Sequence, residues 1–155
     1  MRLCGEYQVN LHIREAITED LQSVLLVYRE AGLATKGNLD LQEAIAIHSR
    51  IKTYPNYRVY VAAIRGQTVG TFALLIMDNL ANGGVPSGIV EDVAVLPSFQ
   101  GRGIGKQMMA FALNLCRKYG CYKMMLSSNE IRSNAHAFYE ALGFKRHGFS
   151  YRVEL

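Results

Sequence analysis

Residues 89–106 read IVEDVAVLPSFQGRGIGK, an apolar run followed by a loop with three glycines at alternate positions. The run 89–96 is rich in β-branched residues and stops at Pro97, which predicts a buried strand. Apolar residues then recur at helical spacing from Ile104 and end at Gly120, which predicts an amphipathic helix. The stretch therefore predicts a strand, a glycine loop and a helix in direct succession.

The three glycines of this loop indicate close approach of the backbone to a ligand. Gly101, Gly103 and Gly105 lose more conformational entropy on folding than other residues would, so stability alone does not explain them. Without side chains in the way, several backbone amides can converge on phosphate oxygens, and the helix N-terminus adds its positive dipole. Arg102 and Lys106 add full positive charges. The loop suits a pyrophosphate, although a plain tight turn would use the same residues.

The sequence of residues 100–107 does not match two better-known phosphate-binding motifs. The dinucleotide fingerprint requires G-x-G-x-x-G, but Lys106 stands where its third glycine should fall. The nucleoside-triphosphate loop requires G-x-x-x-x-G-K followed by Ser or Thr, but Gln100 replaces its first glycine and Gln107 follows the lysine. A nucleotide-binding protein is therefore disfavoured.

Two adjacent carboxylates interrupt the buried strand. A charge there is costly unless it is paired or used, so Glu91 and Asp92 are candidates for a functional role. Alternation along the strand places Glu91 on the face of Val93 and Val95, and Asp92 on the opposite face. Either side chain could instead reach solvent or pair with a basic residue. A carboxylate in partly apolar surroundings can have its pKa raised toward neutral pH, which suits a general base.

The rest of the chain predicts a mixed α/β (α+β) sheet with helices on its faces, because strand and helix patterns are interspersed. The expected elements are a first strand through Val9 to Ile13, a helix capped by Thr18 and stopped by Gly32, a helix from Asp40 to Tyr54, a hairpin of strands 57–64 and 68–77, a strand 122–127, a helix capped by Ser133 or Asn134 and stopped by Gly143, and one or two strands in 144–155.

Composition restricts the class of protein. At 155 residues with half of them hydrophobic, residues 1–155 are expected to form one domain. The net charge of +4 comes from scattered basic residues, which argues against nucleic acid as a partner. No apolar run approaches the ~18 residues of a membrane span, and no signal peptide is evident, so we expect a soluble cytoplasmic protein. Cys4, Cys116 and Cys121 lack metal-ligand spacing, so we expect reduced thiols and no metal site.

The central stretch resembles the GNAT superfamily of acetyl-CoA-dependent N-acetyltransferases. The family signature, Q/R-x-x-G-x-G/A after the fourth strand, is matched at every defined position by Gln100, Gly103 and Gly105. Residues 90–97 are similar to that fourth strand, and residues 134–144 to the family's late helix and following strand. The resemblance implies a central, mixed, mostly antiparallel twisted sheet flanked by about four helices. It also implies acetyl-CoA as the cosubstrate and an amine as the acceptor.

The resemblance also implies roles for matching residues. Glu91 matches a general base that commonly acts through water, and Tyr139 matches the tyrosine that protonates the departing thiolate. Whether Glu91 or Asp92 supplies the base stays open, and the Tyr139 ring could simply pack beside Phe138. Implied cofactor contacts are the backbone of Val93 and Val95 on the pantetheine arm, Asn134 near that arm, and the amides of Gln100, Gly101, Arg102, Gly103, Ile104, Gly105 and Lys106 on the pyrophosphate.

The acceptor is less well defined than the cosubstrate. Residues 90–93 and 120–124 resemble parts of glucosamine-6-phosphate N-acetyltransferases, so we expect a small-molecule amine, with protein or peptide amines left open. Basic residues of the first half that could contact a phosphate group, or could simply be solvated, are Arg29, Lys36, Arg50, Lys52 and Arg58. A non-catalytic coenzyme A-binding module is a second hypothesis, which the presence of Glu91 and Tyr139 disfavours. Family members often pair C-terminal strand edges between subunits, so the resemblance also implies a homodimer.

Overall fold

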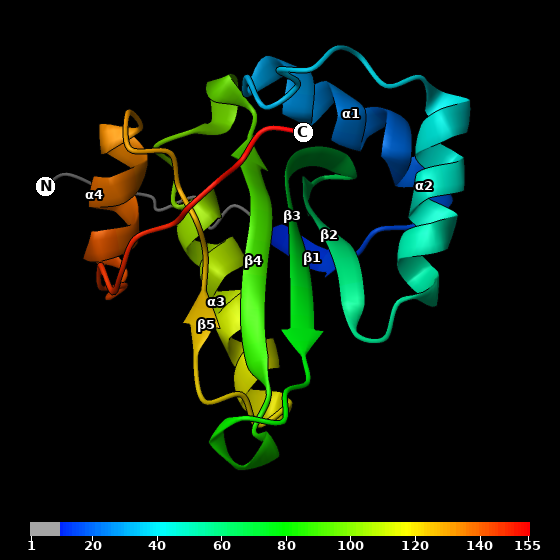
Figure 1. Cartoon of the computed structure of the whole chain (residues 1–155). Coiled ribbons are helices and arrows are strands. Elements are labelled where there is room, and N and C mark those ends of the chain that lie inside the picture. The colour runs from blue at the N-terminus through cyan, green and yellow to red at the C-terminus, as the bar shows by residue number, and fades with distance from the viewer. Residues whose placement is uncertain (1–9) are drawn as a thin grey trace, which may run out of the picture.

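The computed structural model describes residues 10–155 and contains a five-stranded sheet in the order β1-β2-β3-β4-β5 (Figure 1). The first four strands pair antiparallel with their neighbours, and β5 runs parallel to β4, which confirms the predicted mixed, mostly antiparallel sheet. The strands are β1 (Leu11–Glu15), β2 (Tyr57–Ile64), β3 (Gln67–Met77), β4 (Ser87–Val95) and β5 (Met124–Met125). Val9, which the sequence places in the first strand, lies outside the described residues.

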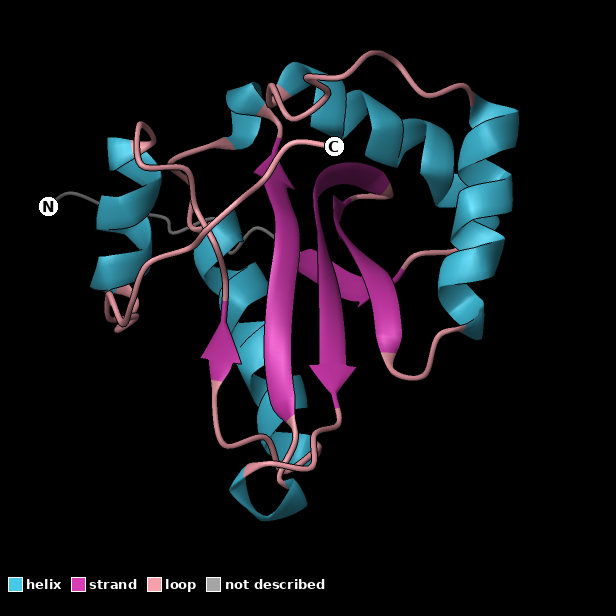
Figure 2. Cartoon of the chain, in the orientation of Figure 1, coloured by secondary structure: helices cyan, strands magenta, loops and turns pink. Residues whose placement is uncertain are grey.

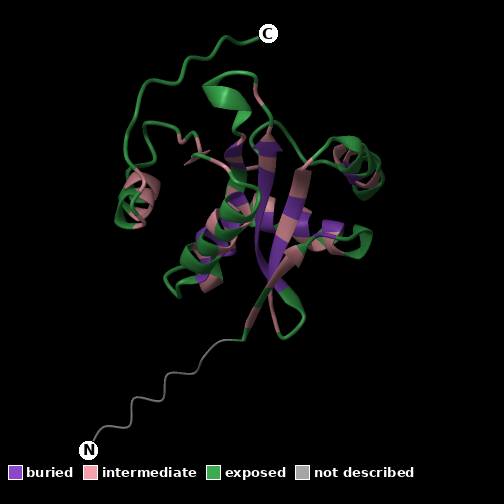
Figure 3. Cartoon of the chain, turned by 90° about the horizontal axis from the view of Figure 1, so that it is seen from below, coloured by how far each residue is buried: buried purple, intermediate pink, exposed green. Residues whose placement is uncertain are grey.

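Residues 10–155 contain four α-helices, as predicted. They are α1 (Leu21–Glu30), α2 (Leu41–Thr53), α3 (Ile104–Lys118) and α4 (Ser133–Ala141). Of these, α1, α2 and α3 pack against the two faces of this sheet. On one face, Met108 of α3 packs with Phe72 and Val90 in the larger core cluster. On the other face, Val24 of α1 packs with Ala73 of β3 in a second cluster. Figure 3 shows that the buried residues gather in the sheet and on the helix surfaces that face it.

The first helix begins later than the sequence predicts. Thr18 is not its cap, because residues Thr18–Asp20 form a 3-10 turn and α1 begins at Leu21. The Asp20 carboxylate accepts a hydrogen bond from the Ile17 amide at 2.8 Å and pairs with Arg14 at 2.6 Å. The hydrogen bond from Arg14 is also the main reason that the pKa of Asp20 is lowered. These contacts favour a separate tight turn before the helix.

The predicted N-terminal caps are present on α2 but not on α4. Asp40 caps α2 as predicted, since its Oδ1 accepts a hydrogen bond from the Glu43 amide at 2.8 Å. The helix α4 begins at Ser133, but Arg132 occupies its N-cap position and no side chain caps it there. The predicted capping by Ser133 or Asn134 is therefore wrong, although the predicted helix is present.

The predicted strands near the C-terminus are shorter or absent. Residues 142–155 contain no regular secondary structure, so the expectation of one or two strands in 144–155 is wrong (Figure 2). The expected strand 122–127 is reduced to Met124–Met125, which pairs only with Gly88 and Ile89 of β4. A strand needs a hydrogen-bonding partner, and beyond this point β5 has none among the described residues.

A β-bulge interrupts β4 at its two carboxylates. Glu91 pairs with Ala73 and Ala94 pairs with Thr71, so one residue of β3 stands opposite two residues of β4. Asp92 takes a positive φ of 53°, which absorbs the extra residue. Bulges of this kind redirect side chains, so the bulge decides which way the two carboxylates face.

Within residues 10–155, no helix combines the length and the apolar character that a membrane crossing requires.

Candidate functional site

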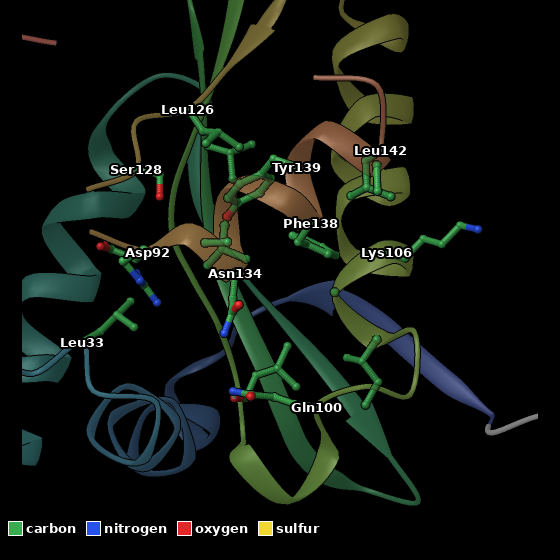
Figure 4. Close-up of a pocket in the computed structure, with 18 of the residues that line it drawn as sticks. Leu33, Asp92, Gln100, Lys106, Leu126, Ser128, Asn134, Phe138, Tyr139 and Leu142 are labelled. Carbon is green, nitrogen blue, oxygen red and sulfur yellow. Dashed lines mark hydrogen bonds between the residues drawn. The ribbon is translucent and has the colours of Figure 1, made fainter. Parts of the chain in front are cut away.

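The separation of β4 from β5 opens a cleft of about 1030 Å³. Among residues 10–155, the two strands pair only at Gly88–Met124 and Ile89–Met125, and the remainder of β4 has no strand partner on that side. The cleft is lined by β4, the glycine loop, the start of α3, the segment after β5 and the helix α4 (Figure 4). The exposed edge of β4 therefore offers backbone groups to whatever occupies the cleft.

The cleft brings together nearly all of the site residues that the sequence predicts. The predicted residues that line it are Glu91, Val93, Val95, Gln100, Gly101, Gly103, Ile104, Gly105, Lys106, Asn134 and Tyr139. Arg102 does not line it, because its guanidinium lies over the Phe99 ring, 5.1 Å from the centroid. In Figure 4, Asp92 and Leu33 lie on the opposite side of the cleft from Phe138, Leu142 and Lys106.

The glycine loop presents a row of free backbone amides at the start of α3. Gly101 and Gly103 have φ values of 74° and 77°, a left-handed conformation that favours glycine. The first helical hydrogen bond runs from the Gln107 amide to the Gly103 carbonyl at 3.1 Å. No amide from Gly101 to Lys106 donates to a backbone acceptor among residues 10–155. These amides, at the positive end of the helix dipole, form a site for an anion.

Gly105, the third glycine of the loop, has a packing role that the sequence alone did not indicate. A Cβ on Gly105 would stand 3.0 Å from Cζ of Phe138, a residue of α4. Gly105 therefore allows α4 to pack closely against the first turn of α3, and this contact closes one wall of the cleft.

Gln100, the first residue of the loop motif, ties the loop to the strand before it. Its Nε2 donates to the carbonyl oxygen of Val95 at 3.1 Å. The end of β4 and the glycine loop are thereby held in a fixed relation. Val95 is also one of the two residues whose backbone the family resemblance assigns to the pantetheine arm.

The bulge reverses the predicted direction of Glu91. Its partner Ala73 belongs to the cluster under α1, so Glu91 faces that side of the sheet, whereas Val93 and Val95 pack on the α3 side. The expectation that Glu91 shares a face with these two valines is therefore wrong, because the extra residue shifts the alternation by one. Asp92 borders the main cleft and also a second cavity of about 270 Å³ beneath the α1–α2 connection.

The surroundings of both carboxylates disfavour their charged forms. Burial, followed by the negative charge of Asp92, raises the pKa of Glu91. Burial also raises the pKa of Asp92. Raised values bring a carboxylate closer to the operating range of a general base, so both remain candidates for that role.

Tyr139 combines a packing role with an accessible phenol. Its ring makes edge contacts with Phe138 and Phe144, at centroid distances of 5.1 and 5.6 Å. Burial is the main reason that its pKa is raised; the charge of Arg132 opposes the shift and that of Glu91 adds to it. The phenol therefore keeps its proton at neutral pH, and it lines the cleft together with Glu91.

Several residues of the cleft are not among the catalytic and cofactor-binding residues that the sequence predicts. Leu33 comes from the connection between α1 and α2, Ser127 and Ser128 follow β5, and Arg132 precedes α4. Each lies in an irregular segment with no motif, so only the tertiary structure brings it to the cleft.

Neither of the two described cysteines lines this cleft. Cys116 and Cys121 are free thiols, and burial is the main reason that the pKa of Cys116 rises to about 12. A thiol of this kind is a poor nucleophile at neutral pH. Cys4 lies outside the described residues. Within the described part of the chain, no three His, Cys, Asp or Glu side chains are grouped so that they could hold a metal ion.

Comparisons with known proteins find similar acetyltransferases. The acetyltransferase (GNAT) family matches residues 21–144. A glucosamine 6-phosphate N-acetyltransferase of Trypanosoma brucei brucei is 37% identical over 98 residues, which are 63% of this chain and 65%, just under two thirds, of that protein. An aminoalkylphosphonate N-acetyltransferase of Salmonella typhimurium is 31% identical over 143 residues, 92% of this chain and 90% of that protein. The crystal structure of a Trypanosoma brucei acetyltransferase has a TM-score of 0.81 and 31% identity, and the alignment covers 94% of this chain and 100% of that one.

Proposed function

The chain belongs to the acetyltransferase (GNAT) family, and on this premise we propose that it transfers the acetyl group of acetyl-CoA to the primary amine of a small molecule. The observation that carries the proposal is the row of free amides from Gly101 to Lys106, which opens on the same cleft as Glu91 and Tyr139. A site for a polyanion, a base and an acid in one cleft are what this reaction requires. The two named relatives act, by their names, on glucosamine 6-phosphate and on aminoalkylphosphonates, which are small amines with an anionic phosphorus group.

The residues of the cleft fit the chemical parts of acetyl-CoA. In this proposal the pyrophosphate binds the amides of residues 101–106 at the N-terminus of α3, with Lys106 as a nearby cation. The pantetheine arm lies along the unpaired edge of β4 at Val93 and Val95, and Asn134 of α4 contacts it from across the cleft. When bound, acetyl-CoA supplies an acetyl group already activated as a thioester.

The mechanism uses Glu91 as the base and Tyr139 as the acid. Glu91 accepts, directly or through water, the proton that the acceptor ammonium must lose before its nitrogen can attack. The nitrogen forms a bond to the acetyl carbon and the carbon–sulfur bond breaks. Tyr139 then gives its proton to the sulfur of the leaving coenzyme A, which requires a phenol that is still protonated at neutral pH. The second proton that the nitrogen loses on forming the amide returns to the Tyr139 phenolate, so the protons balance.

A thiol-release assay tests this function directly. The purified protein is incubated with acetyl-CoA and a panel of small amines and amino-terminal peptides, and free thiol and acetylated product are both measured. We expect thiol release that depends on a small amine, with one acetylated amine per thiol. Tight binding of acetyl-CoA without transfer to any amine would instead support a non-catalytic coenzyme A-binding module, and transfer to peptides alone would support a protein acetyltransferase.

Replacing Gly103 by valine is expected to weaken acetyl-CoA binding at least tenfold. At φ 77° a branched residue is strained by about 1–2 kcal/mol, and its side chain would displace the amides from the pyrophosphate. Calorimetric titration with acetyl-CoA measures the loss. Gly66→Val is the matched control, because Gly66 has φ 81° in the β2–β3 turn and lies outside both cavities. Equal loss of affinity in the two variants, or unchanged affinity in a folded Gly103→Val, would show that the loop does not bind the pyrophosphate.

Gly105→Val tests whether the close packing of α4 against the start of α3 is needed for acetyl-CoA binding. Its side chain would collide with Phe138, so we expect weaker acetyl-CoA binding together with a lower melting temperature, because α4 must move. Full binding by the folded variant would show that the position of α4 does not matter to the cofactor.

We also propose that the protein is a homodimer built through its C-terminal segment. Apolar residues alternate with polar ones from Phe149 to Leu155, and Phe149, Tyr151 and Val153 are 90%, 90% and 80% exposed (Figure 3). A period of two with one apolar side is typical of a strand, and β5 leaves an unpaired edge among the described residues. In this proposal, pairing with a second copy buries the apolar side.

Light scattering tests the dimer. We expect the unmodified chain to have twice the monomer mass, and the double variant Tyr151→Ser, Val153→Ser to be a monomer. The control removes the polar side instead: Arg152→Ser, Glu154→Ser breaks a 2.9 Å ion pair but keeps the apolar residues, and should stay dimeric. A monomeric wild type at assay concentrations would reject the proposal.

A further inference from the structure

We propose that the smaller cavity beside Asp92 is the acceptor subsite, and that it selects amines carrying an anionic group, with Asp92 at the amine end and Arg29 at the anionic end. The inference rests on the proposed acetyl transfer and adds to it the charge pattern of the acceptor.

The position of the cavity connects it to the reaction. It lies between the end of α1, the α1–α2 connection and the bulge of β4, and it shares Leu33 and Asp92 with the main cleft. An amine held at Asp92 therefore lies where the two cavities meet, one residue along the strand from Glu91. The volume of about 270 Å³ is below the roughly 300–1,000 Å³ of pockets for drug-sized ligands, so the cavity suits a compact molecule.

The structure singles out Arg29 from the basic residues of the first half. Arg29 lines the cavity, and none of the ion pairs among residues 10–155 uses it. Arg58 is already engaged, since it approaches Glu15 at 3.3 Å and donates to the carbonyl of Tyr54 at 3.0 Å. The other basic candidates line neither cavity: Lys36, Arg50 and Lys52. A guanidinium without a carboxylate partner is suited to a phosphate, phosphonate or carboxylate.

The lining of the cavity also contains an acidic side chain and several apolar ones. The bulge turns Asp92 toward this cavity, where its carboxylate can pair with an ammonium group. Leu25, Leu33 and Leu39 also line the cavity and make part of its wall apolar. Tyr28 borders the same cavity as a neutral phenol, because burial and then the charge of Asp92 raise its pKa. The cavity therefore matches a short molecule with an ammonium at one end and an anion at the other.

A matched pair of acceptors separates the charge preference from acetyl transfer itself. Ethanolamine and O-phosphoethanolamine differ only by the phosphate. For both, kcat/KM for acetylation is measured with the full chain in the oligomeric state in which it is purified. We expect the wild type to prefer O-phosphoethanolamine by at least tenfold. Arg29→Met should remove that preference by lowering kcat/KM for O-phosphoethanolamine about tenfold to a hundredfold, with less than a twofold change for ethanolamine. Arg29→Lys should be intermediate, because it keeps the charge but not the planar fork.

Two further variants make the test specific. Asp92→Asn should raise KM for both amines alike, since both carry the ammonium group. Arg50→Met, a control on α2 that removes the same charge outside both cavities, should match the wild type with both acceptors. Acetyl-CoA affinity by calorimetry should be unchanged in Arg29→Met. Turnover of both amines with no preference, or a preference that survives Arg29→Met, would overturn the acceptor inference while leaving acetyl transfer intact. Absence of transfer to any small amine would count against the proposed function itself.

Discussion

Tyr139→Phe is expected to lower kcat by about 100-fold or more while the affinity for acetyl-CoA changes less than twofold. Phenylalanine keeps the ring that contacts Phe138 and Phe144, so the packing of α4 and the shape of the cleft should persist. Only the phenolic proton is lost, and the departing thiolate must then take a proton from water. Steady-state kinetics and calorimetry on the same preparation measure the two quantities.

A second tyrosine provides the control for this prediction. Tyr119 follows the last residue of α3, is half exposed and lies outside the cleft, so Tyr119→Phe should keep the wild-type rate. If Tyr139→Phe also turns over at the wild-type rate, the phenol is a packing residue. The reaction would then depend on proximity and on polarisation of the thioester by backbone groups.

Glu91→Gln is expected to lower kcat/KM at neutral pH by about 100-fold, with partial recovery at higher pH. The amide keeps the size of the side chain but cannot accept the proton of the ammonium. As pH rises, more of the free amine is already deprotonated, so less help from a base is needed. In the wild type, activity should rise with pH through the pKa of Glu91, which burial and the charge of Asp92 place above the ordinary value. Glu91→Gln should lack this rise through the pKa of Glu91 and should keep only the rise at higher pH that follows deprotonation of the amine.

Asp92→Asn distinguishes the two carboxylates. If Glu91 is the base, removal of the neighbouring negative charge lowers its pKa, so the acidic side of the pH profile should move to lower pH. If Asp92 is the base, the acidic side should instead disappear in Asp92→Asn and persist in Glu91→Gln. A wild-type pH profile in both variants would show that neither carboxylate acts as the base.

The sequence by itself determined the strand, glycine loop and helix of residues 89–118, and with them the proposed anion site. These features depend on local chemistry: a β-branched run, glycines where the backbone must be bare, and apolar residues at helical spacing. The positions of Glu91 in a strand and of Tyr139 in a late helix followed from the same local patterns.

Only the tertiary structure decided how these parts face one another. The bulge at Asp92 shifted the alternation by one residue, and a sequence period of two cannot show where the register slips. The contact between Gly105 and Phe138, and the place of Arg29 in the same cavity lining as Asp92, depend on segments far apart in the chain. The C-terminal residues kept a strand pattern but formed no strand, because a strand is completed by the backbone of its neighbour and not by its own sequence.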